Sequence, residues 1–249
     1  MEGDILFYTL AVIAAFLAGA SKGGLSMVGV LCVPLLSLST SPVAAAALLL
    51  PIYIVSDMYG LWAFRKSFDM RNLMILGPAT TLGVIIGWAT AHITSPRLVT
   101  LLLGVIGLSY CINALVRRGN IPFKAADVTR GLFWGTISGF TSFVAHSGGP
   151  PFQVYVLPQK LDRMKFAGTV TVLFTYVNAI KLLPYWALGQ FNPGNLKLAA
   201  MLSPIAVVGA FAGYRLVKIM PDKLFFRLVE IALAALSVKL IYSAVFGAG

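Results

Sequence analysis

The residues LGPATTLGVIIGW at 76–88 and LSPIAVVGAFAGY at 202–214 decide how this chain is organised. Each stretch starts with leucine and has a proline two positions later, glycines five and nine positions after the proline, and then an aromatic residue. The two stretches lie 126 positions apart. Upstream the offset is 124, where Val33-Pro34 matches Leu157-Pro158 and Trp62-Ala63 matches Trp186-Ala187. This shared order of landmarks indicates an internal duplication.

The composition indicates a membrane protein. Of the 249 residues, 59% are hydrophobic and 11% are charged, whereas an ordinary soluble domain carries roughly 25% charged residues. A single soluble core of this size could not bury so much apolar surface. The net charge of +11 comes from Lys and Arg in short loops, which is typical of membrane topology and argues against nucleic acid as a partner.

Breakers and charges divide the chain into ten apolar segments. We expect an all-α integral membrane protein of two repeats with about five membrane elements each: residues 1–118, a cytoplasmic linker at 119–130, and residues 131–249, together one transporter domain. The apolar segments are 5–20, 25–38, 42–64, 73–93, 98–116, 131–146, 150–158, 164–188, 198–219 and 224–246.

The distribution of basic residues predicts that the repeats are inverted. If 25–38 and 150–158 each turn back within the membrane, fourteen Lys and Arg residues lie on one side and only Arg97 and Lys197 lie on the other. Four crossings per half would instead give seven against eight, which shows no bias. Because basic residues accumulate in cytoplasmic loops, we expect five elements per half and both termini outside the cytoplasm.

The two broken segments are too short to cross a bilayer. As helices, 25–38 would span about 21 Å and 150–158 about 14 Å, against a hydrocarbon core of about 30 Å. Short segments interrupted by Gly or Pro, at matching places in inverted repeats, indicate the binding site of a transporter.

The candidate binding residues lie at these interruptions. At the offset of 124, Lys22 corresponds to His146 and Gly24 to Gly148. Glycines permit sharp turns and close approach of a ligand, and a new helix start can bind an anion. The plainer interpretation is that the glycines only pack helices and that Lys22 extends to the interface. The predicted substrate-binding residues at the breaks are Ser21, Lys22, Gly23, Gly24, His146, Ser147, Gly148 and Gly149.

Three polar residues within long apolar segments complete the prediction. Asp57 and Lys181 occupy equivalent positions, but inversion would separate them by roughly 8 Å along the membrane normal. Asp57 is the candidate for proton coupling, with a local pair to an arginine at the cytoplasmic end as the alternative. Lys181, with Asn178 one turn earlier, is expected to face the binding cavity.

The glycine-rich break followed by an apolar run ending in Val33-Pro34 resembles the signature of the sulfite exporter TauE/SafE family. The second half repeats it at 147–150 and at Leu157-Pro158, and the resemblance covers nearly the whole chain. It implies a bacterial inner-membrane protein that moves small sulfur-containing anions, often outward. Lys22 and the pair Pro150-Pro151 depart from the commoner glycine-only pattern of the family, so the resemblance does not fix the substrate.

Together these observations predict a secondary transporter, and an exporter, of small anions such as sulfite or organosulfonates. An anion channel of the same architecture and a transporter of another small anion remain alternatives. An enzyme is not expected, because the sequence has no HExxH motif and no paired carboxylates. The expected partners are the anion, membrane lipid and a coupling proton; no cofactor and no metal are expected.

Overall fold

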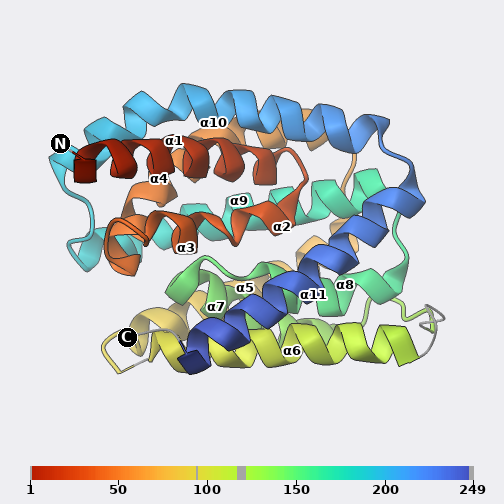
Figure 1. Cartoon of the computed structure of the whole chain (residues 1–249). Helices are drawn as coiled ribbons and strands as arrows, with labels where there is room; N and C mark the ends of the chain where they lie inside the picture. Colours follow the sequence, from red (N-terminus) through yellow and green to blue (C-terminus); the bar gives the residue numbers. More distant parts are fainter. Residues whose placement is uncertain (1, 94, 117–121, 247–249) are drawn as a thin grey trace. The chain divides into compact units, whose positions relative to one another are not determined.

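A computed structural model describes residues 2–93, 95–116 and 122–246, and all regular secondary structure in these ranges is helical (Figure 1). This confirms the all-α class. The elements are α1 (Glu2–Lys22), α2 (Ser26–Gly29), α3 (Cys32–Leu36), α4 (Pro42–Phe64), α5 (Met70–Ala89), α6 (Pro96–Val116), α7 (Val128–Ala145), α8 (Gly149–Val156), the 3-10 turn η1 (Leu157–Gln159), α9 (Arg163–Ala187), α10 (Pro193–Ile219) and α11 (Asp222–Phe246).

The helices follow the apolar segments but several extend beyond them. Helix α7 begins at Val128 because the Asp127 side chain accepts a hydrogen bond from the Arg130 amide at 2.7 Å. Helix α10 likewise begins at Pro193, after Asn192 accepts from the Asn195 amide at 2.8 Å. The segment 25–38 is not one helix: it forms α2 and α3, of four and five residues.

Five helices in the described ranges are long and apolar enough to cross a membrane, as judged by length and composition. They support a multi-pass membrane protein. Part of the predicted linker, residues 119–121, lies outside the described residues, as do Arg117 and Arg118. The five spans are Ile5–Lys22, Val43–Phe64, Met70–Ala89, Arg163–Ala187 and Pro193–Ile219.

The chain forms two compact units. The first contains α1–α4, α9 and α10, and in it α1 packs along α10 (Figure 1). Small residues bring these two backbones together: a side chain at Gly19 would overlap the carbonyl of Ala206, and one at Gly209 would overlap the carbonyl of Phe16. Glycines therefore set the close spacing of α1 and α10.

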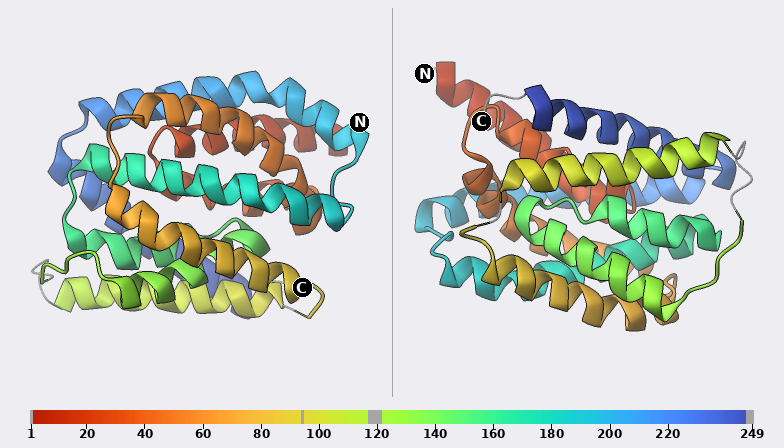
Figure 2. Two further views of the ribbon diagram at one scale, coloured as in Figure 1. Left: turned by 180° about the vertical axis from the view of Figure 1, so that it is seen from behind. Right: turned by 90° about the horizontal axis from the view of Figure 1, so that it is seen from below.

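The second unit contains α5–α8 and α11, and in it α5 packs along α7 (Figure 2). A side chain at Gly83 would overlap the carbonyl of Thr136, and one at Gly139 would overlap the carbonyl of Thr80. Helix α6 packs along α11 in the same unit.

Glycines at corresponding positions of the two predicted repeats pack helices in both units. Gly83 and Gly87 on α5 correspond in sequence to Gly209 and Gly213 on α10. The α5 pair faces α7, and the α10 pair faces α1. Each unit thus contains helices from both predicted repeats. The first predicted membrane element of each repeat, α1 or α7, packs against the fourth predicted element of the other, α10 or α5.

Candidate functional site

The charged side chains that are buried in the described residues are Lys22, Asp57 and Lys181, and all three belong to the first unit. Lys22 is the last residue of α1, and its Nζ lies 2.9 Å from Oδ1 of Asp57 on α4. The Asp57 side chain is fully buried and the Lys22 side chain is 7% exposed. Taking two charges out of water is costly unless they pair and hydrogen-bond. This ion pair offsets part of the free-energy cost of burying the two charges.

Helix α9 supplies the other partners of Asp57. The single hydrogen of the Thr175 hydroxyl is within reach of Oδ1 at 3.0 Å and of the carbonyl of Thr171 at 2.8 Å, and the Asn178 amide donates to Oδ2 at 2.9 Å. These two residues are three positions apart and therefore lie on one face of the helix. Both carboxylate oxygens are thus held by polar groups from outside α4.

Lys22 is held by further contacts. Its Nζ lies 4.9 Å from the ring centroid of Tyr53, one turn before Asp57 on α4, in a cation–π geometry. The Tyr53 hydroxyl donates to the carbonyl of Gly29 at 3.1 Å, and Thr171 donates to the carbonyl of Lys22 at 3.3 Å. The break after α1 is therefore tied to both α4 and α9.

Lys181 lies on α9 one turn after Asn178 and is 0% exposed. It interacts electrostatically with both Lys22 and Asp57. The cluster therefore combines two basic side chains with one carboxylate. When all three are ionised its net formal charge is positive, which is the condition for attracting an anion.

The first glycine break is a helix C-cap. Gly24 has φ +105°, and the amides of Gly24 and Leu25 donate to the carbonyls of Ser21 and Ala20 at 3.2 and 3.3 Å. This is the Schellman arrangement. It directs these amides back to α1, and α2 is a single turn, so the expected anion-binding helix start is not formed here. The buried Ser21 hydroxyl likewise donates to Ala18, at 2.6 Å.

The glycines of this break also allow close packing. A side chain at Gly23 would overlap the carbonyl of Ala210, and a Cβ at Gly24 would lie 2.9 Å from Cβ of Ala167. The plainer interpretation of these glycines as packing residues is therefore supported. Lys22, by contrast, does not extend to the interface but is buried in the cluster.

The second glycine break belongs to the second unit. His146 caps α7 in the left-handed conformation, with φ 49°, and its amide donates to Ser142 at 3.1 Å. The Ser138 hydroxyl donates to the carbonyl of Gly148 at 2.7 Å. His146 thus takes the capping position that Gly24 has after α1, whereas Lys22 is still inside its helix.

A new helix does start at Gly149, as the sequence predicts, with Pro150 and Pro151 in its first turn. Prolines have no amide hydrogen, and the Phe152 amide already bonds to the carbonyl of Gly148 at 3.4 Å. This helix start therefore offers few backbone donors to an anion. Because the breaks belong to different units, a joint site formed by Lys22 and His146 stays a prediction.

Residues 11–240 match the family described as sulfite exporter TauE/SafE. The chain belongs to this family. Neither the curated proteins nor the solved structures gave a match. Membership of the TauE/SafE family indicates a membrane transporter of sulfur anions, in keeping with the apolar helices described above.

Sequence reasoning selected Lys22, Asp57, Asn178 and Lys181, and the structure brings these four residues of the TauE/SafE chain together. The alternative that Asp57 pairs with an arginine at the cytoplasmic end is wrong, because its ion-pair partner is Lys22. The charge that neutralises Asp57 comes from the end of α1, which packs against α4.

Sequence reasoning missed Tyr53, Thr171 and Thr175. A signal for two of them exists: Thr171, Thr175, Asn178 and Lys181 recur every three or four residues along α9, which is the period of one helix face. A polar stripe in an otherwise apolar helix indicates a buried polar contact. No group of three or more metal-binding side chains occurs in the described ranges.

Proposed function

We propose that this TauE/SafE protein is a secondary transporter that exports small sulfur-containing anions, such as sulfite or organosulfonates, across the bacterial inner membrane. Family membership supports the substrate class. The observation that carries the proposal is the buried cluster of Lys22, Asp57 and Lys181, in which two basic groups accompany one carboxylate. Ionisable residues at membrane depth are costly and mark substrate or ion pathways.

The donors of this cluster suit a small oxyanion. Each lysine ammonium carries three N–H donors, and the amide of Asn178 and the hydroxyl of Thr175 add further donors. In the described structure Asp57 accepts from Lys22, Thr175 and Asn178. A substrate oxyanion would use these same donors, so Asp57 acts as the internal competitor of the substrate.

This competition gives Asp57 a role in coupling. Protonation of Asp57 would remove its attraction for Lys22 and release the ammonium for the substrate. Loading one monovalent anion together with one proton leaves the net formal charge of the cluster unchanged. Because uncompensated buried charge is strongly unfavourable, the proton and the anion are expected to enter together.

The glycine breaks complete the proposed site. Ser21, Gly23 and Gly24 end α1 and thereby position Lys22 beside Asp57. In the second half, we retain His146, Ser147, Gly148 and Gly149 as substrate contacts on the basis of the sequence symmetry. His146 would add a hydrogen bond or, when protonated, a second positive charge.

The proposed architecture is two inverted repeats, 1–118 and 131–249, with both termini outside the cytoplasm. The asymmetric distribution of Lys and Arg supports this topology. The packing of α1 on α10 and of α7 on α5, through glycines at corresponding positions, supports the duplication.

Anion binding to purified protein tests the proposal, with sulfite, thiosulfate, sulfonates, sulfate and carboxylates as the panel. Lys181→Met should weaken binding of the preferred anion by about ten- to a hundredfold, because a charge-assisted hydrogen bond is worth roughly 1.5–3 kcal/mol. The control Lys239→Met removes an exposed lysine from α11 and should have no effect. Wild-type affinity in Lys181→Met would show that this cluster does not bind the substrate.

Flux measurements in proteoliposomes separate the transporter from the channel. A transporter should show flux that saturates with anion concentration and responds to a proton gradient. Flux that does not saturate and ignores the gradient would identify an anion channel instead.

A further inference from the structure

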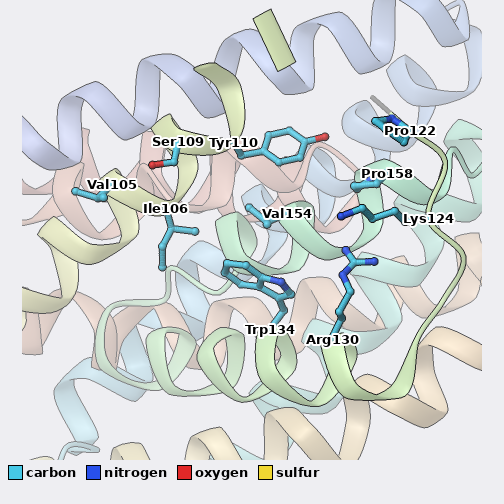
Figure 3. Close-up of a pocket in the computed structure, with 10 residues that line it drawn as sticks. All are labelled: Val105, Ile106, Ser109, Tyr110, Pro122, Lys124, Arg130, Trp134, Val154 and Pro158. Atoms are coloured by element: carbon cyan, nitrogen blue, oxygen red, sulfur yellow. The ribbon is translucent and has the colours of Figure 1, made fainter. Parts of the chain in front are cut away.

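The second unit contains a cavity of about 450 Å³ between α6, α7, α8 and the segment that precedes α7 (Figure 3). Such a volume lies in the range of small-ligand sites, roughly 300–1,000 Å³. The charge cluster, by contrast, consists of residues of the first unit. Its lining residues are Val105, Ile106, Ser109, Tyr110, Pro122, Lys124, Arg130, Trp134, Val154 and Pro158.

One end of the cavity is basic. In Figure 3 the charged ends of Lys124 and Arg130 point toward each other. The backbone fixes both residues: the Lys124 amide donates to the carbonyl of Pro158 at 3.1 Å, and Arg130 lies in the first turn of α7. The Arg130 guanidinium also lies 5.6 Å from the ring centroid of Tyr155 on α8. Two cationic side chains in this arrangement can both donate hydrogen bonds to one phosphate group.

The opposite end of the cavity is mainly apolar, and the Ser109 hydroxyl also lies there. Val105 and Ile106 come from α6, and Trp134 comes from α7. Val105 and the neighbouring Leu102 are exposed in the described structure, as expected for side chains that face lipid. A small oxyanion has no apolar part to contact this end, so the lining fits a ligand with an anionic head and a hydrocarbon chain.

We propose that this cavity binds one anionic phospholipid, with the phosphate between Lys124 and Arg130 and an acyl chain along Ile106 and Trp134. The predicted topology places Lys124 and Arg130 on the cytoplasmic side, where basic pockets between membrane helices bind anionic head groups. Trp134 is suited to the boundary between head group and chain. The lipid contacts α6, α7 and α8 together and therefore stabilises the second unit when bound.

Native mass spectrometry of the purified full-length protein tests this site. The probes are phosphatidylglycerol, phosphatidylcholine and glycerol phosphate, the last being a soluble head group without acyl chains. The double variant Lys124→Gln/Arg130→Gln should bind phosphatidylglycerol more weakly by on the order of thirtyfold, since each basic residue near an anionic surface contributes about a factor of five. The control Lys66→Gln/Lys223→Gln removes two exposed lysines on the same predicted side and should bind as the wild type does.

A second variant tests the apolar end. Ile106→Trp fills the cavity beside Trp134 and should weaken binding of phosphatidylglycerol while leaving both basic residues in place. Lys124→Gln alone changes an exposed side chain whose backbone bond to Pro158 is retained, so its folding is not at risk.

Three outcomes would overturn the proposal. The first is wild-type affinity for phosphatidylglycerol in the double variant and in Ile106→Trp. The second is equal binding of phosphatidylglycerol and phosphatidylcholine, which would mean that the basic end does not select charge. The third is equal binding of glycerol phosphate and phosphatidylglycerol, which would identify a site for a soluble anion instead of a lipid.

Discussion

Removal of Asp57 alone should destabilise the protein more than removal of Lys22 and Asp57 together. Their ion pair is 2.9 Å long and both side chains are buried. Removal of Asp57 alone leaves two buried lysines without a carboxylate, and an uncompensated buried charge costs about 3–5 kcal/mol. Removal of Lys22 alone leaves Asp57 with Lys181, and removal of both residues leaves Lys181 as the one charge of the cluster. The three variants to compare are Lys22→Met, Asp57→Leu and the double variant.

The contacts of each residue predict which single variant is worse. Asp57→Leu leaves Lys22 beside a second lysine, Lys181, and removes one acceptor from the Asn178 amide. It should cost about 5 kcal/mol, the upper end of the range. Lys22→Met leaves Asp57 with its donors Thr175 and Asn178 and with the charge of Lys181. It should cost about 3 kcal/mol.

Thermal unfolding in detergent measures these differences. For a chain of this size 1 kcal/mol corresponds to about 2–4 °C in the unfolding midpoint, so Asp57→Leu should lower the midpoint by about 10–20 °C and Lys22→Met by about 6–12 °C. The double variant leaves one buried lysine without a carboxylate instead of two, so it should unfold at a higher temperature than Asp57→Leu. If its loss equals the sum of the two single losses, the residues are not coupled and the reasoning is refuted.

Three other predictions concern packing, binding with coupling, and topology. Gly209→Val should lower the unfolding midpoint because its side chain would overlap the backbone of α1. The control Gly77→Ala places its side chain in open space, so it should increase the stability by up to about 1 kcal/mol and raise the midpoint slightly. Equal effects of the two variants would show that the glycines do not set the helix spacing. Lys22→Ala should weaken anion binding about ten- to a hundredfold. Asp57→Asn should abolish proton-driven uptake while anion exchange continues. Unchanged proton-driven uptake in Asp57→Asn would show that Asp57 does not carry the coupling proton. A reporter that functions only outside the cytoplasm should be active when it is fused at Gly249. Activity of a reporter that functions only in the cytoplasm would contradict the predicted topology.

Much of the helical fold could be predicted because each long helix is a run of apolar residues bounded by breakers. Helix α4 coincides with the predicted segment 42–64. The first residues of α7 and α10 were predicted less well. Asp127 and Asn192 cap these helices, which therefore begin in polar sequence before the apolar segments. The sequence predicted the position of the break after α1. It did not predict that the amides of this break donate to carbonyls of α1.

The sequence by itself determined that the chain is a helical membrane protein. It also predicted an internal duplication and selected Lys22, Asp57, Asn178 and Lys181 as unusual polar residues. Hydropathy and the order of Pro and Gly are local properties, so they can be seen without a structure. Only the tertiary structure decided that Asp57 pairs with Lys22 and receives hydrogen bonds from α9. The physical reason is that these partners come from α1 and from a helix more than a hundred residues away, and that packing in three dimensions brings them to the same carboxylate.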